Sequence, residues 1–410
     1  MSENGARMSR RRFLGSTLSV AALAALGEPL AEAASPKIIR RGEMVYRRLG
    51  RTELMVSELG IGGSPSPEPA VFSAALDRGI NYMDTSVNYG NGNGERLVGR
   101  VVKGRRDKVH ISTKFPLRRV EDNVTQGIIT AAEQALQRLQ TDYIDIWCIH
   151  GVTAAAPCLR DEVLEAFEKL KQQGKIRFAG VSCHRDPANV LPPIIESGRF
   201  DVVLLAFNVF SGTRVTKEDV AAGKVYDNWL EESGLQKVLD LAKQHDVGLV
   251  AMKTMAGGAR QNLAKFQTGN TTLAQAKLKW VLSHDAVASA LSEVLTFRIL
   301  EENLGAVGQT LTPQDEALLR EHVVARTREV CRFCGRCATA CPARLPIPEI
   351  MRCLVYYAEH KKRNRARALY RAVAKGYAPE LCRECNACLR ACPHGLDVRQ
   401  RLARAHALLA

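Results

Sequence analysis

The sequence predicts an α/β fold, a closed (β/α)8 barrel, followed by a small α-helical domain that contains eight cysteines. Short apolar, β-branched runs alternate with amphipathic stretches over most of the chain. Two identical cysteine spacings lie close to the C-terminus. The chain has 410 residues, of which 46% are hydrophobic, and this supports two or three domains with a large buried core.

Eight candidate strands follow one another along the chain, and helical patterns separate them. The strands are Met55–Ile61, Ile80–Thr85, Val109–Lys114, Ile144–Ile149, Ile176–Val181, Val202–Phe207, Gly248–Met252 and Ala288–Val294. The clearest helical patterns are Thr125–Leu139, Glu162–Gln172, Leu235–Gln244 and Leu273–Leu282. Strands that alternate with helices indicate βα units in a parallel sheet, and eight such units match the size of a TIM barrel.

An open, doubly wound sheet is the alternative arrangement of the same units. It favours a glycine-rich turn, G-x-G-x-x-G, after the first strand. Residues 60–65 read G-I-G-G-S-P, so the third glycine is missing and a proline interrupts the start of a helix. The sequence therefore favours the closed barrel.

The first 33 residues contain the three parts of an export signal. Residues 9–15 read S-R-R-R-F-L-G, an apolar stretch follows from Ser16 to Leu26, and residues 31–33 (A-E-A) form a small-x-small cleavage site. Paired arginines followed by Phe-Leu resemble a twin-arginine (Tat) signal. We therefore expect export by this route, a periplasmic or extracytoplasmic location, and a mature chain that begins near Ala34.

The rest of the chain divides by its patterns. Residues 34–43 are expected to form a linker, 44–310 the barrel, 311–325 a helical connector and 326–410 the cysteine-rich domain. No apolar run outside the signal reaches the ~18–20 residues of a membrane span. No stable membrane span is therefore expected after removal of the signal.

Eight of the twelve cysteines form two copies of the spacing C-x2-C-x2-C-x3-C-P. The first copy is Cys331, Cys334, Cys337 and Cys341, and the second is Cys382, Cys385, Cys388 and Cys392. In this ferredoxin spacing three cysteines grip one 4Fe–4S cluster and the fourth ligates the other cluster. We therefore assign Cys392 to the first cluster and Cys341 to the second. Zinc is the alternative metal for these cysteines, but zinc sites favour two cysteine pairs.

The spacer between the two motifs resembles that of an α-helical two-cluster ferredoxin, because it contains helical patterns around Ile347–His360 and Arg365–Lys375. The formal net charge is +15, and residues 326–410 hold 18 Lys or Arg against 6 Asp or Glu. Such charge can offset that of the clusters or attract an acidic electron partner. The basic run at residues 361–367 is either a solvated helix face or a docking patch. No nucleic-acid module surrounds it, and nucleic acid is not expected as a partner.

Polar side chains stand at the C-terminal ends of consecutive strands, where a barrel places its chemistry. Asp84 ends the second strand, Lys114 the third, His150 follows the fourth, and Tyr89 lies five residues after Asp84. A tyrosine hydroxyl can give a proton to a carbonyl oxygen if its pKa is lowered, and a neighbouring ammonium lowers it. An aspartate can hold the lysine, and a histidine can orient the carbonyl.

These residues lie in motifs that resemble the aldo/keto reductase superfamily. The matching segments are residues 46–52 (Y-R-R-L-G-R-T), 56–60 (V-S-E-L-G), 81–86 (N-Y-M-D-T-S), 112–114 (S-T-K) and 145–150 (D-I-W-C-I-H). The resemblance covers residues 44–310 and implies that Tyr89 is the general acid/base, that Lys114 and Asp84 tune it, and that His150 aligns the substrate. It also implies a nicotinamide cofactor across the barrel mouth.

The nicotinamide side of the resemblance is less complete. Cys183, Leu204 and Met252 stand where the family usually has Asn, Gln and Tyr, and an amide gives directional hydrogen bonds that Cys and Leu cannot replace. The remaining candidate residues for NAD(P) are Ser182, Asn208, Lys253, Arg298, Glu302 and Asn303. A 2′-phosphate could meet Arg298, which favours NADP over NAD.

The sequence thus predicts an exported iron–sulfur oxidoreductase of the aldo/keto reductase type. A small carbonyl and its alcohol would interconvert in the barrel, with electrons passing through two 4Fe–4S clusters to or from a partner protein. Hydride moves two electrons and each cluster takes one, so a splitting agent such as flavin is expected, although no flavin site is evident. The alternatives are an electron-transfer module on a catalytically retired barrel that docks with a larger redox complex, or clusters that only brace the fold. The insertion Ser211–Glu232 either covers the barrel mouth or is a surface loop.

Overall fold

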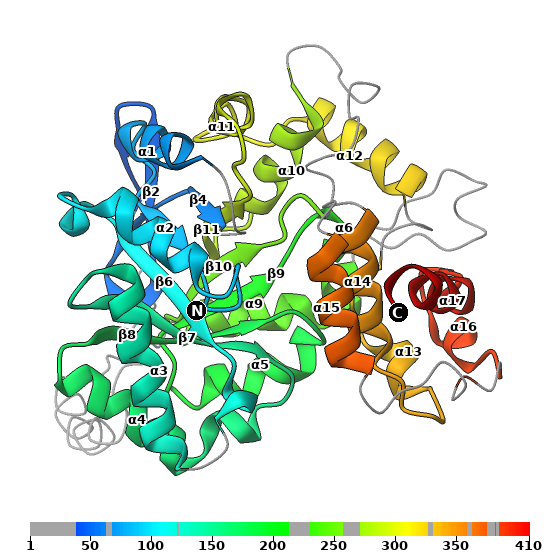
Figure 1. Cartoon of the computed structure of the whole chain (residues 1–410). Helices are drawn as coiled ribbons and strands as arrows, with labels where there is room; N and C mark the ends of the chain where they lie inside the picture. The colour runs from blue at the N-terminus through cyan, green and yellow to red at the C-terminus, as the bar shows by residue number, and fades with distance from the viewer. Residues whose placement is uncertain are drawn as a thin grey trace, which may run out of the picture. The chain divides into compact units, whose positions relative to one another are not determined.

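The computed structural model describes residues 38–62, 68–120, 123–212, 229–256, 271–326, 331–358, 363–374, 382 and 385–410. Eight parallel strands close into a barrel in the order β10-β11-β4-β5-β6-β7-β8-β9 (Figure 1). They are β4 (Leu59–Gly62), β5 (Tyr82–Asp84), β6 (His110–Phe115), β7 (Ile144–Val152), β8 (Ile176–Cys183), β9 (Val202–Ala206), β10 (Gly248–Met252) and β11 (Val287–Ser292). The predicted (β/α)8 barrel is confirmed, and the open sheet is excluded because β11 pairs with β4 and closes the ring.

Helices surround the barrel and alternate with its strands (Figure 1). They are α1 (Pro69–Asp77), α2 (Asn93–Val102), α3 (Val124–Leu139), α4 (Asp161–Gln172), α5 (Pro187–Glu196), α9 (Leu235–Gln244), α10 (Leu273–Leu282) and α11 (Phe297–Leu304). Short 3-10 helices are η1 (Gly50–Thr52), η2 (Arg106–Lys108), η3 (Leu117–Arg119) and η4 (Ala156–Leu159). The apolar stripe of α3, with Ile128, Ala132 and Leu139, is buried, as the periodicity of three and four predicts.

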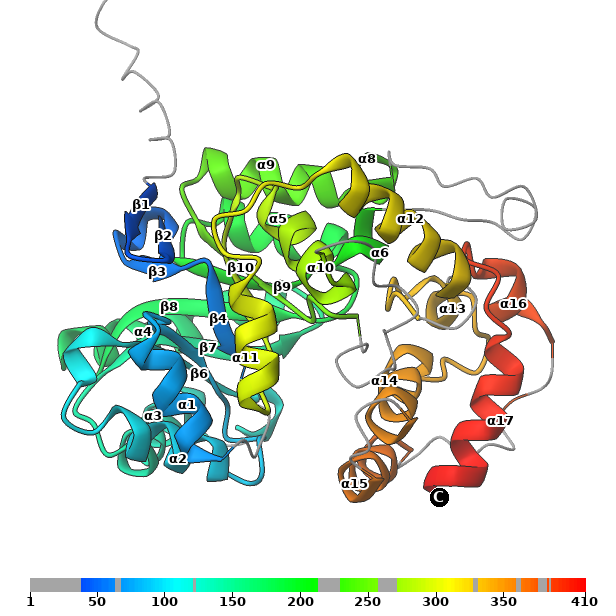
Figure 2. The same cartoon turned by 90° about the horizontal axis from the view of Figure 1, so that it is seen from above.

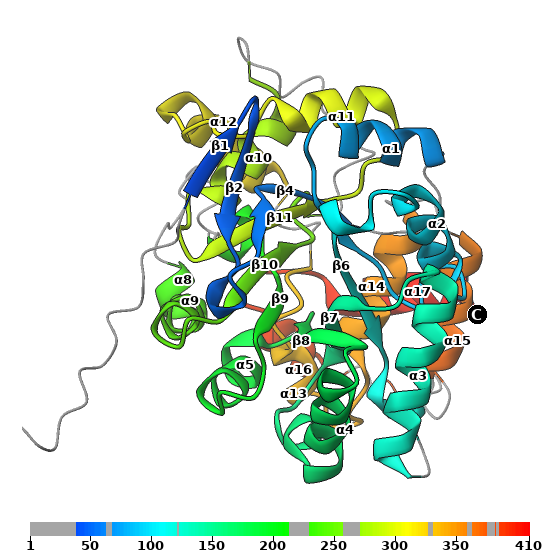
Figure 3. The ribbon, with the colours of Figure 1, turned by 90° about the vertical axis from the view of Figure 1, so that its left-hand side faces the viewer.

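A three-stranded antiparallel sheet precedes the barrel (Figure 3). It consists of β1 (Ile38–Arg41), β2 (Met44–Arg48) and β3 (Met55–Ser57), so part of the expected linker 34–43 is a strand. The single strand predicted over Met55–Ile61 was wrong, because its first half pairs with β2 and its second half is β4. The division falls at Glu58, whose buried carboxylate accepts hydrogen bonds from the Arg47 side chain and the Gly308 backbone N–H.

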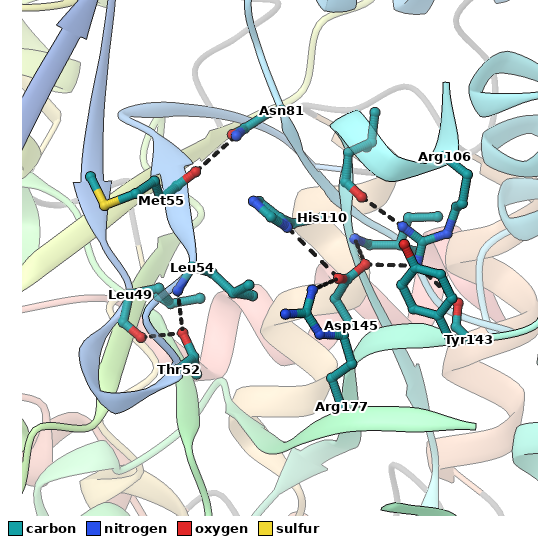
Figure 4. A network of polar contacts seen from close by, with 12 residues as sticks. Leu49, Thr52, Leu54, Met55, Asn81, Arg106, His110, Tyr143, Asp145 and Arg177 are labelled. Atoms are coloured by element: carbon teal, nitrogen blue, oxygen red, sulfur yellow. Dashed lines mark hydrogen bonds and ion pairs between the residues drawn. The ribbon is translucent and has the colours of Figure 1, made fainter. Parts of the chain in front are cut away.

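A buried charge network joins three strands at the N-terminal end of the barrel (Figure 4). The Asp145 carboxylate, 1% exposed, accepts hydrogen bonds from Arg106 at 2.7 Å, Arg177 at 2.9 Å and the Ile111 backbone N–H at 2.9 Å. Burial raises the pKa of Asp145, but the hydrogen bond with His110 and the charge of Arg106 outweigh it and lower the pKa to about 2. The ionised carboxylate therefore holds β6, β7 and β8 together.

The chain after the barrel is helical, and the predicted small α-helical domain is confirmed. The helices are α12 (Pro313–Arg326), α13 (Arg336–Thr339), α14 (Ile347–Ala358), α15 (Arg363–Ala374), α16 (Ala387–Ala391) and α17 (Val398–Leu409). Helices α14, α15 and α17 pack against one another (Figure 2) around buried Ile350, Leu354, Tyr370 and Leu409. This core is separate from that of the barrel.

Two predictions concern residues outside those that the structure describes. They are the export signal and most of the insertion Ser211–Glu232, of which only the flanking α6 (Val209–Gly212) and α8 (Trp229–Glu232) are described. Within the described ranges, none of the helices has the length and apolar character that crossing a membrane requires.

Candidate active site and cluster sites

A buried lysine–aspartate pair lies at the C-terminal ends of β5 and β6. The Lys114 ammonium donates to both carboxylate oxygens of Asp84, at 2.5 and 2.6 Å, and to the Thr85 backbone carbonyl at 2.8 Å. Burial lowers the pKa of Lys114, but the charge of Asp84 outweighs it and the net shift is upward. Lys114 is therefore a cation, held in place by the neighbouring strand.

His150 stands at the end of β7 as a neutral imidazole. Its Nδ1 lies 2.9 Å from Ser86 Oγ and 3.1 Å from Asn88 Nδ2. Burial lowers the pKa of His150 well below its ordinary value, and the charges of Lys114 and Arg352 lower it further. When Asn88 donates to Nδ1, the ring carries its proton on Nε2 and can donate it to a substrate oxygen.

Tyr89 completes the set of four predicted catalytic residues. Its ring centroid lies 6.0 Å from that of His150, edge to face, and 5.6 Å from Lys114 Nζ. The expected lowering of the tyrosine pKa was wrong in its net direction. Burial raises the pKa of Tyr89, and the charge of Lys114 opposes this shift without reversing it. The four residues thus share one site with a neutral tyrosine as proton donor, and their catalytic roles stay a prediction.

The predicted nicotinamide residues lie on β8 and just after β9 and β10, and two of them already form hydrogen bonds with other parts of the chain. Ser182 Oγ accepts a hydrogen bond from the Gly151 backbone N–H at 2.9 Å. The Asn208 amide donates to the Lys253 carbonyl at 3.2 Å and accepts from the Phe210 backbone N–H at 3.1 Å. Burial lowers the pKa of Lys253 to about 7. A nicotinamide carboxamide would compete with these contacts, and its binding stays a prediction.

The predicted residues for the adenosine end all lie on α11. Arg298 is exposed and Glu302 is half-buried. Asn303 is buried, donates to Ser292 Oγ at 2.9 Å, and has a carbonyl oxygen without a partner among the described residues. The helix therefore presents polar groups that could hold the adenosine end of a nucleotide.

The eight cysteines of the two motifs surround two separate cavities. One cavity is lined by Cys331, Cys334, Cys337 and Cys392, and the other by Cys341, Cys382, Cys385 and Cys388. The fourth cysteine of each motif thus joins the other set, as the spacing predicts. Among the described residues, no group of three or more His, Cys, Asp or Glu side chains is spaced closely enough to hold a single metal ion. Burial raises the pKa of Cys331 and Cys337 to about 12, so these thiols keep their protons until iron displaces them.

The first cysteine loop lies against the end of β10. Phe333, between Cys331 and Cys334, has its ring centroid 4.6 Å from Lys253 Nζ. The neighbouring Arg332 guanidinium lies 5.5 Å from the Phe210 ring centroid. The first cluster site is therefore next to the strand ends at the barrel mouth.

Helices α14 and α15 also reach the catalytic residues. The Arg365 guanidinium on α15 lies over two rings, 5.3 Å from the Tyr89 centroid and 4.8 Å from the Tyr356 centroid. Glu349 on α14 accepts a hydrogen bond from Arg185 of the barrel at 2.9 Å. The C-terminal domain thus contributes side chains to the catalytic site.

Several of these residues are not predicted from the sequence. Ser86 and Asn88 lie in the segment between Asp84 and Tyr89, and their polar character there was the available signal. Arg352 and Arg365 belong to the basic C-terminal region, but no local pattern shows that their helices contact the barrel.

The family match and the relatives reported below make this chain an oxidoreductase. Residues 64–270 match the aldo/keto reductase family, and the chain belongs to that family. Residues 330–396 match a 4Fe-4S dicluster domain, which makes the C-terminal domain an iron–sulfur domain.

Several relatives match the chain over about two thirds of its length. The oxidoreductase YqkF of Bacillus subtilis is 29% identical over 303 residues, which cover 68% of this chain and 96% of the relative. Methylglyoxal reductase YeaE of Escherichia coli is 28% identical over 262 residues, covering 62% and 83%. The holo form of an aldo-keto reductase from Bacillus halodurans has a TM-score of 0.53 at 26% identity, covering 67% and 95%. A Klebsiella pneumoniae aldo-keto reductase in complex with NADPH has the same TM-score at 24% identity, covering 67% and 93%.

Proposed function

We propose that this aldo/keto reductase is exported and that it exchanges electrons between a small carbonyl or alcohol substrate and a partner protein through two 4Fe–4S clusters. The observation that carries the proposal is the position of the first cysteine loop. Phe333 of that loop contacts Lys253, directly after β10, and Arg365 of the same domain covers Tyr89. These two contacts support a redox centre beside the acid–base groups.

The reaction needs two electrons and two protons for each carbonyl. Tyr89 gives one proton to the carbonyl oxygen, while His150 orients that oxygen with its Nε2–H and Lys114 stabilises the phenolate that remains. A nicotinamide held at this site would supply the hydride. Its regeneration would take two electrons from the clusters, one proton, and an agent such as a flavin that combines single electrons into a hydride. The reverse reaction oxidises an alcohol and delivers two electrons outward.

The proposed export rests on the signal-like N-terminus, whose twin arginines are Arg10 and Arg11. The Tat route carries folded proteins, which suits a protein whose thiolates must receive iron before they meet an oxidising compartment. Cell fractionation tests this proposal. Changing both arginines to lysine should leave the uncleaved protein in the cytoplasm, whereas cleavage and export of the double variant would contradict it.

Anaerobic cluster reoxidation tests the redox function. The purified full chain should contain about eight irons and eight sulfides, and its denaturation should release the bound nucleotide or flavin, which chromatography identifies. Clusters reduced with dithionite should be reoxidised by the carbonyl substrate in the wild type. Clusters that stay reduced with carbonyls but are reoxidised by a one-electron acceptor such as ferricyanide would favour the alternative, an electron-transfer module on a retired barrel.

Matched cysteine variants test the two cluster sites. Cys331→Ser and Cys392→Ser should lose the same signal in electron paramagnetic resonance, and Cys341→Ser and Cys382→Ser should lose the other. Cys353→Ser, a buried thiol outside both motifs, is the control and should keep both signals. Loss of one common signal in all four variants would contradict two separate clusters.

A further inference from the structure

Two arginines of the C-terminal domain face the catalytic residues without acidic partners. The Arg365 guanidinium lies over the rings of Tyr89 and Tyr356, 5.3 Å and 4.8 Å from their centroids. The Nε atom of Arg352 is buried and has no hydrogen-bond partner among the described residues. No ion pair within the described ranges includes either residue. Guanidinium N–H groups are therefore available at the catalytic site.

The positive charges of both arginines act on the catalytic groups themselves. The charge of Arg352 adds to burial in lowering the pKa of His150, His184 and Lys253. The charge of Arg365 acts on His150 and, against the effect of burial, on Tyr89. The ring centroids of His150 and His184 are 5.7 Å apart, so these two imidazoles are neighbours in one site.

The acidic residues nearby do not balance these charges. Asp84 is paired with Lys114, and Glu349, one turn before Arg352 on α14, is paired with Arg185. Arg118 adds a further positive charge toward His150 and has a partner of its own. A partly desolvated site with excess guanidinium groups favours a ligand that carries an anionic group, which can accept two N–H bonds from one arginine.

We infer that the substrate carries a carboxylate or phosphate group close to its reacting carbonyl or alcohol, and that Arg352 and Arg365 bind this group. The inference rests on the proposed function and adds the substrate class. It assigns the C-terminal domain a second role beside electron transfer, because the residues that select the substrate come from α14 and α15.

Titration calorimetry of the full-length, cluster-loaded protein with oxamate and oxamide tests this inference. Both molecules have adjacent carbonyl groups, but only oxamate has a carboxylate. Oxamate should bind more tightly than oxamide, and Arg352→Ala or Arg365→Ala should weaken oxamate binding between about tenfold and about one-hundredfold. Inorganic phosphate forms a second arm, because tighter binding of phosphate than of oxamate would identify a phosphate-bearing substrate.

Matched variants separate binding from folding. Arg371→Ala removes the same charge from an exposed position of α15 and should leave oxamate binding unchanged. Arg352→Lys keeps the charge and should retain part of the affinity. Iron content and melting temperature should equal those of the wild type in every variant that is compared. A variant that loses iron is replaced by its lysine counterpart.

Two outcomes would overturn the inference: equal binding of oxamate and oxamide, or unchanged oxamate and phosphate binding in both alanine variants. Failure of the proposed function gives a different result. In that case oxamate still binds through the two arginines, but no carbonyl or alcohol exchanges electrons with the clusters.

Discussion

The two ends of the barrel contain buried charges in opposite states of balance. At the N-terminal end the Asp145 carboxylate contacts Arg106 and Arg177, and its contacts lie within the barrel. At the C-terminal end Lys114 has Asp84, but Arg352 and Arg365 have no acidic partner among the described residues. The balanced end stabilises the fold, and the end with excess charge is prepared for a ligand. Substitutions at either end of the barrel test this comparison.

The largest expected effect is on turnover, from Tyr89→Phe. Loss of the hydroxyl removes the proposed proton donor, so turnover should fall by about 10²- to 10⁴-fold. Rapid-mixing measurements of cluster reoxidation by a carbonyl give the rate. The iron content and melting temperature should not change, and a rate like that of the wild type would remove Tyr89 from the mechanism.

The next effect is on stability, from Lys114→Met. This change leaves the Asp84 carboxylate buried without its partner, which should cost about 3–5 kcal/mol in the free energy of unfolding. Anaerobic denaturant titration measures it. Adding Asp84→Asn to the same chain should recover most of the stability without restoring turnover. Equal stability of the single and double variants would show that the pair is not a buried ion pair.

At the opposite end, Asp145 should make stability depend on pH. Its pKa is lower in the folded chain than in the unfolded chain, so its contribution is present above the unfolded pKa and is lost as the pH falls through about 2. At neutral pH this contribution should be about 2 kcal/mol. The difference in unfolding free energy between the wild type and Asp145→Asn should be constant above pH 5 and should decrease below it. A difference that does not change with pH would contradict the low pKa.

The smallest effect is expected from Arg185→Ala, which breaks the contact with Glu349 between the barrel and α14. The pair is partly exposed, with side chains 30% and 21% accessible. Its loss should cost less than about 1 kcal/mol. Oxamate affinity should remain within twofold of the wild type. A large loss of affinity would mean that this ion pair positions α14 over the catalytic site.

The sequence predicts the barrel well because its signals are local. Strands such as Gly248–Met252 are short apolar runs between helical patterns, and the spacing from Asp84 to Tyr89 is fixed within one segment. The register of β5 and β6 then places Lys114 beside Asp84 without further information. The placement of Cys341 and Cys392, each in the cavity of the other motif, also follows from a local spacing rule.

The features that the sequence does not predict depend on distant contacts. The turn at Glu58 is held by Gly308, which lies 250 residues away. The upward pKa shift of Tyr89 comes from its burial, to which helices of the C-terminal domain contribute. Local periodicity shows that α14 and α15 are helices, but it does not show which surface they contact.

The fourth cysteine of each motif lines the cavity of the other motif, and this arrangement has a consequence for maturation. Each cluster, once inserted, joins two loops that are about fifty positions apart in the sequence, so one occupied site brings together the two loops that contain the ligands of the other. We expect iron to enter cooperatively, with few half-loaded molecules. The same loops support the helices that carry Arg352 and Arg365. In a chain without iron, these two side chains would therefore not be positioned to select the substrate. The enzyme would then gain its cofactors and its selectivity in a single assembly step, ahead of the proposed export.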